Sequence, residues 1–164
     1  MDLSVFYAAM AGIAFTLTGI WWYVVAANPD WSSRSERRLL AYVVGMSFML
    51  PGAMSLLSII APDQPMLWRA TFAVAGILGL ASVLLVLRTL REDHDTPRVV
   101  KAFQLLLVPL YAIVALIALF PEIPGNLGMT LKGIQVEAIA NTLVVLFGAQ
   151  CAFILTLEPR RTQG

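Results

Sequence analysis

The sequence predicts an all-α integral membrane protein, built as a five-helix transmembrane bundle. Of its 164 residues, 59% are hydrophobic and only 13% are charged, whereas soluble domains are roughly 45–50% apolar and about 25% charged. A soluble domain of this length could not hide the excess, because much of its surface must stay in water. Five apolar stretches are each long enough to cross the bilayer core, which takes about 20 residues of helix.

The five spans follow one another in a single transmembrane domain, residues 1–164. The first is expected to be a true span, because its apolar run exceeds the roughly 7–15 residues of a signal-peptide core. Charged or proline-containing segments end the first four spans, in order "NPDWSSRSERR", "PDQP", "RTLREDHDTPR" and "PEIPGN". Proline ends helices because its ring fixes φ and its nitrogen carries no proton. The spans are expected at residues 3–27, 39–61, 67–87, 99–120 and 131–157.

The basic residues predict the orientation. Nine of the eleven arginines and lysines lie in the first loop, around the third loop or in the C-terminal tail, and only Arg69 and Lys132 lie on the other side. Cytoplasmic loops carry an excess of Lys and Arg, so the N-terminus is expected outside and the C-terminus in the cytoplasm, in a cell membrane. Trp21 and Trp22 at the inner interface and Trp68 at the outer one fit the aromatic belts of membrane proteins.

The fifth span carries polar residues where they are hard to solvate. At about 100° per residue, Glu137, Asn141 and Gly148 share one face, while Gln135 and Thr142 lie on another. Neither face suits lipid. The fifth span is therefore expected to be the least lipid-exposed helix, either central in the bundle or packed between its own bundle and a second subunit.

Glu137 is the first candidate for an ion or solute pathway. Intramembrane carboxylates often mark such pathways, and Asn141 lies one turn further on. The alternative is a structural carboxylate near the outer interface that is protonated or that reaches water or Lys132. Glu137 and Asn141 fall outward of the midplane, by roughly 10 Å and about 5 Å at 1.5 Å per residue.

Four more polar residues complete the candidate pathway. Gln104 in the fourth span and Gln150 in the fifth fall at nearly the same depth, so an amide pair is expected, worth about 0.6–2 kcal/mol in membranes. Thr16 and Ser47 lie near the midplane and are expected to partner Asn141.

Two prolines inside spans are candidate hinges. Pro51, which is followed by Gly52, and Pro109 each leave a carbonyl group without its helical donor. Transporters use broken helices to line their sites, although proline is also simply more frequent in membrane helices.

Small residues four apart predict close helix packing, mostly within the chain. They occur in four spans as Ala8/Gly12, Ala41/Gly45, Ala75/Gly79 and Gly148/Ala152.

The composition excludes several functions. A net charge of +1 without a basic block argues against a nucleic-acid partner. Cys151 is the sole cysteine and His94 the sole histidine, so disulfides, bis-histidine haem and histidine metal clusters are not expected in one chain, and no cofactor or metal is predicted. Asp93 and Asp95 flank His94, but adjacent residues seldom converge on one ion. Without a nucleophile–base set, metalloprotease motif or nucleotide-binding motif, we expect no enzymatic activity.

Two functional classes remain. The first is a channel or carrier for an ion or small solute, acting as a homo-oligomer because five short helices enclose little volume. The second is a non-transporting accessory or assembly subunit of a larger membrane complex. Membrane lipids and further copies or other membrane subunits are the expected partners.

Overall fold

The computed structural model describes residues 3–60, 64–91 and 96–157, and every regular element among them is an α-helix. Five helices are long and apolar enough to cross a membrane, which confirms the predicted fold class. Two helices of four residues, α2 (Asp30–Ser33) and α6 (Ile123–Asn126), lie between them. The five long helices are α1 (Leu3–Ala26), α3 (Ser35–Ile60), α4 (Pro65–Leu90), α5 (Arg98–Leu119) and α7 (Gly133–Thr156).

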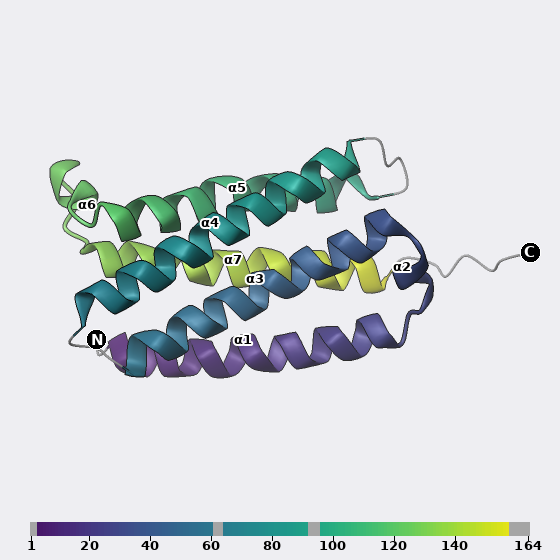
Figure 1. Ribbon diagram of the computed structural model, residues 1–164, viewed down its shortest axis with the longest axis horizontal. Coiled ribbons are helices and arrows are strands. Elements are labelled where there is room, and N and C mark those ends of the chain that lie inside the picture. The colour runs from purple at the N-terminus through teal and green to yellow at the C-terminus, as the bar shows by residue number, and fades with distance from the viewer. Residues whose placement is uncertain (1–2, 61–63, 92–95, 158–164) are drawn as a thin grey trace, which may run out of the picture.

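The long helices form three tiers. Helices α3 and α7 lie in the middle and contact each other, α1 packs along one side of this pair, and α4 and α5 pack together along the other (Figure 1). Helix α1 begins at one end of the bundle and α7 finishes at the other, as five crossings require. We name the ends after the predicted orientation: α1 and α7 begin at the outer end, and α1 finishes at the inner end.

Within the chain the most buried helix is α3, so the fifth span is not the least exposed helix of a single bundle, and its packing against a second subunit stays a prediction. In their most apolar stretches, 61% of the residues of α3 are buried against 44% for α7 and 28% for α1. The reason is position: α3 contacts α1, α2, α4 and α7, whereas α7 leaves one flank uncovered. Polar residues on two faces of the fifth span therefore did not predict which helix has the most helical neighbours.

Side chains tie the helices together at both ends. At the outer end, the Tyr7 hydroxyl donates a hydrogen bond to the Ile134 carbonyl across α1 and α7, at 3.1 Å. Arg69 of α4 donates from Nε to the Ala118 carbonyl at 3.0 Å and from an Nη to the Leu119 carbonyl at 2.8 Å. These carbonyls belong to the last turn of α5, where a positive charge is stabilising. A basic residue at the predicted outer end thus caps a helix.

Three of the four small-residue motifs serve contacts within the chain. A β-carbon at Gly45 would come within 3.3 Å of the Trp21 ring, and one at Gly148 within 2.8 Å of the Ser47 β-carbon. At Gly79 a β-carbon would overlap the ring of Tyr111. The fourth motif is different, because Gly12 on α1 is exposed and has no neighbour within 4 Å of such an atom.

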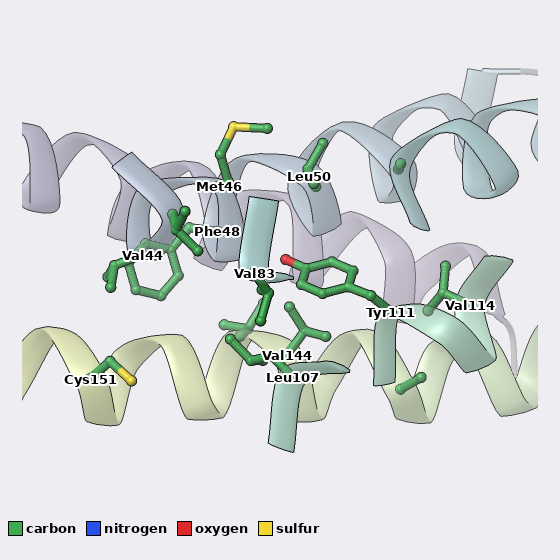
Figure 2. Close-up of a cluster of buried hydrophobic side chains, with 14 of the residues drawn as sticks. Val44, Met46, Phe48, Leu50, Val83, Leu107, Tyr111, Val114, Val144 and Cys151 are labelled. Atoms are coloured by element: carbon green, nitrogen blue, oxygen red, sulfur yellow. The ribbon is translucent and has the colours of Figure 1, made fainter. Parts of the chain in front are cut away.

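The core consists of apolar side chains from all five long helices. Figure 2 shows part of it, in which Tyr111 of α5 lies among Val83 of α4, Leu107 of α5 and Val144 of α7. Because Gly79 lacks a side chain, the Tyr111 ring can lie directly against α4.

The orientation predicted from the basic residues can be tested directly. In a Cys151→Ala background, single cysteines at Ser35 and at Gln64, which are both exposed, are labelled in intact cells with a membrane-impermeant maleimide. We expect Gln64→Cys to react from outside and Ser35→Cys to react only after lysis. Reaction of Ser35→Cys alone in intact cells would invert the assigned topology.

The close approach of α4 and α5 makes a second prediction. Gly79→Ala should destabilise the bundle by about 1–3 kcal/mol, because the added methyl forces the Tyr111 ring to move in a packed core. Gly19→Ala is the matched control, since a β-carbon there meets nothing within 4 Å. Reversible unfolding in mixed micelles measures both, and equal effects would show that the Gly79–Tyr111 contact is not tight.

Candidate functional site

Glu137 and Asn141 lie about one helical turn apart on the inward face of α7. Both are fully buried, as are Val144 and Gly148 further along the same face, so the predicted shared face of the fifth span is confirmed. Neither oxygen of the Glu137 carboxyl group has a hydrogen-bond partner, and neither polar atom of the Asn141 amide has one. Buried polar atoms normally have a hydrogen-bond partner, so four neighbouring polar atoms without one are unusual.

Tyr7 of α1 lies beside Glu137. Glu137 lies close enough to Tyr7 for the two side chains to interact electrostatically, and the Tyr7 hydroxyl is already committed to the Ile134 carbonyl. Lys132 is exposed and contributes no hydrogen bond to the carboxyl group. The alternative in which Glu137 reaches Lys132 is therefore wrong.

The middle of the bundle holds a second polar group, made by Ser47 and Tyr111. Ser47 of α3 is fully buried and donates to the Val43 carbonyl at 3.1 Å. The Tyr111 hydroxyl reaches the Ser47 side chain, although it makes no hydrogen bond of regular geometry. Gly148 of α7 packs against the same serine, so α3, α5 and α7 meet at this point.

Towards the inner end, Gln104 meets Cys151 rather than Gln150. Gln104 is fully buried, and its amide nitrogen donates to the Cys151 sulfur at 3.7 Å, while its amide oxygen has no partner. Gln150 is exposed on the outside of α7. The expected Gln104–Gln150 pair is wrong, because equal depth does not fix rotation: one residue step turns a side chain by about 100°.

Ser47 does not partner Asn141, whose two polar atoms have no hydrogen-bond partner, and neither does Thr16. It is exposed, and its hydroxyl donates to the Gly12 carbonyl of its own helix at 2.8 Å. A threonine that is satisfied by the preceding turn carries little cost on a lipid-facing surface, which explains why a polar residue at midplane depth can point away from the interior.

The candidate hinges lie in unbroken helices. Helix α3 continues through Pro51 and α5 through Pro109. Gly52 allows close contact with α1, because a β-carbon there would come within 3.2 Å of the Ala14 β-carbon. This contact gives Gly52 a packing role, and hinge motion at either proline stays a prediction.

Three pairs of these buried polar groups form three levels along the interior. Glu137 with Asn141 comes first, Ser47 with Tyr111 second, and Gln104 with Cys151 third. At 1.5 Å per residue, Glu137 and Cys151 are about 21 Å apart along α7, so the levels extend over most of a hydrocarbon core of about 30 Å. We refer to them as the polar line.

Two cavities between the helices do not reach the polar line. One of about 310 Å³ lies between α1 and α3 at the inner end, and one of about 410 Å³ is an open groove between α3 and α4. No residue of the polar line lines either of them.

Sequence reasoning missed Tyr7 and Tyr111. Tyrosines of membrane proteins gather at the interfaces, so Tyr111, in the middle of a span, was a signal that could have been used. Tyr7 lies only four residues into its helix, at a depth where interfacial aromatics are common. Its role depends on the rotation of α1, which hydropathy does not reveal.

Among residues 3–60, 64–91 and 96–157, no group of three or more His, Cys, Asp or Glu side chains is placed to hold a metal ion. His94, Asp93 and Asp95 lie outside the described residues, so the reading of that loop as solvated rather than metal-binding stays a prediction.

Comparison with known proteins finds no matching family model, no matching curated sequence and no matching solved structure. Function is therefore inferred from this chain's own residues.

The Tyr7–Ile134 bond can be tested by deletion of one oxygen. Tyr7→Phe should lower the free energy of unfolding by about 1 kcal/mol, the usual net value of such a bond. Tyr23→Phe removes the same atom from an exposed tyrosine and should change little. If Tyr7→Phe unfolds like the wild type, the hydroxyl does not hold α1 against α7.

Proposed function

We propose that the protein is a small carrier that moves a proton or a small cation across the membrane, with Glu137 as the group that binds it. One observation supports this above all: a fully buried carboxyl group with neither oxygen hydrogen-bonded. An isolated charge in such surroundings costs several kcal/mol. A side chain kept there despite this cost is a functional-site hypothesis by default, and a bound proton or cation would remove the cost.

Asn141 and Tyr7 give the proposed site its second and third polar groups. The Asn141 amide offers an oxygen to a cation and a nitrogen to a carboxylate, and both of its polar atoms lack partners. Tyr7 bounds the site towards the outer end, because its hydroxyl is held by Ile134. Access from that end would require this bond to open.

A carrier fits better than a permanently open channel. No residue of the polar line lines either of the two described cavities. Between the first and last levels of the polar line, Gly148 packs tightly against Ser47. Ions crossing such an interior need the helices to move apart at one end and then at the other, as in alternating access. Pro51 and Pro109 are the positions at which we expect the bending.

The proposed working form is a homo-oligomer in the cell membrane, surrounded by lipid, without nucleic-acid partners or enzymatic activity. Its support is α1, the least buried long helix. Ala8, Gly12 and Thr16 are exposed on it at intervals of four residues, and small residues in this pattern allow two helices to approach closely.

Proton flux into liposomes tests the carrier directly. Purified protein is reconstituted with a pH-sensitive dye inside, and a potassium diffusion potential drives cations inward. We expect acidification above that of protein-free liposomes, and Glu137→Gln should abolish it, because the amide keeps the shape but cannot take up a proton. Replacing protons by sodium or potassium as the driven ion identifies the cargo.

Glu122→Gln is the matched control, since Glu122 is an exposed carboxylate outside the long helices. It should keep wild-type flux, and all three proteins should show the same circular dichroism and melting. Flux that survives Glu137→Gln would make the carboxylate structural. No flux of any tested ion by the wild type, with purification only alongside other membrane subunits, would favour the accessory-subunit function.

A further inference from the structure

The cavity at the inner end has the dimensions and chemistry of a ligand site. Its volume of about 310 Å³ falls at the lower end of the range for small-molecule pockets. It lies between the last turns of α1, the short helix α2 and α3, and no residue of the polar line lines it. Its lining is mainly aromatic and apolar and includes Trp21, Trp22, Tyr42, Met46, Met49 and one charged residue, Arg38.

One wall of the cavity is fixed by internal contacts. The Trp21 indole nitrogen donates to the Ala41 carbonyl at 2.8 Å, and its ring packs against Trp31 at a centroid distance of 5.6 Å. Gly45 leaves room beside this ring, since a β-carbon there would lie 3.3 Å from it. With its hydrogen bond satisfied and its position held, Trp21 presents an apolar face.

The opposite side of the cavity opens towards the bilayer. Trp22 and Tyr42 are among its lining residues and are both exposed, at 61% and 58%. Tryptophan and tyrosine favour the depth of the lipid headgroups. Met46 and Met49 are unbranched and polarisable, so they adapt to an apolar occupant of irregular shape.

Arg38 is the charged residue of the lining. A guanidinium group has five N–H donors and binds phosphate in a forked geometry, so Arg38 can hold an anion while keeping other contacts. An occupant that satisfies both parts of the cavity must have an apolar body and an anionic end. Of the molecules in a bilayer, an anionic phospholipid has this form and meets the cavity at the right depth.

We propose that this cavity binds one anionic phospholipid, with an acyl chain between Trp22, Tyr42 and the two methionines and the phosphate at Arg38. The charge of Arg38 selects for the anionic headgroup, because a zwitterionic lipid carries its own cation next to the phosphate. The lipid would lie between α1 and α3, so its binding stabilises the bundle.

The proposal can be tested by measuring which lipids the purified protein retains. Full-length protein is extracted from nanodiscs of equimolar phosphatidylglycerol and phosphatidylcholine, and native mass spectrometry counts the lipids that stay bound. We expect one phosphatidylglycerol to be retained by the wild type and by Arg34→Gln, which removes a charge from the same region but not from the cavity lining. Arg38→Gln should lose the preference, and Met49→Trp, which fills the cavity, should lose the lipid.

Tryptophan fluorescence gives a second readout that does not depend on a variant. Phosphatidylglycerol with brominated acyl chains, added at a small mole fraction to phosphatidylcholine nanodiscs, should quench the tryptophans of the cavity and spare Trp68 at the outer end, and the melting temperature should rise. Equal retention of the two lipids, or equal losses in Arg34→Gln and Arg38→Gln, would overturn the proposal in favour of general attraction to charge. A preference for free alkyl phosphate over phospholipid would overturn it in favour of a soluble amphiphile.

Discussion

The contact between α3 and α7 is the constraint on which the rest of the bundle depends. At Gly148 the two helices approach so closely that a β-carbon would come within 2.8 Å of Ser47. Helices in lipid associate through close van der Waals packing rather than through burial from water. Once this glycine faces α3, the rotation of α7 is set, and residues four and seven positions earlier on its face must also point inward.

This geometry explains why the interior contains a carboxylate. Asn141 lies seven residues before Gly148 and Glu137 lies eleven before it, and spacings of seven and eleven return to the same face of an α-helix. Turning Glu137 towards lipid would pull Gly148 away from Ser47. The same packing therefore holds a carboxyl group, with its two unpartnered oxygens, inside the bundle.

The number, order and approximate limits of the helices could be predicted from the sequence, because each depends on local hydropathy and on proline or charged segments. The inward face of α7 could also be predicted, since it follows from periodicity along one helix. Partners on other helices could not. Gln104 meets Cys151 rather than Gln150, and Thr16 faces outward, because such contacts depend on how each helix is rotated against its neighbours.

The two ends of the bundle differ in ways that bear on the proposed carrier. At the outer end, Tyr7 and Arg69 tie α1 to α7 and α4 to α5 through backbone carbonyls. At the inner end, the Trp21 side chain links α1 to α3 beside a cavity that is lined by exposed aromatic residues.

Glu137 lies near the outer end, beside Tyr7. On the proposed mechanism, loading from the outside would require a local opening of α1 against α7, and release to the inside would require α3, α5 and α7 to separate over the remaining two levels of the polar line. On this mechanism the second motion would disturb more packing than the first, so inward release is expected to be the slower step, and the lipid proposed between α1 and α3 would act at the end where that step finishes.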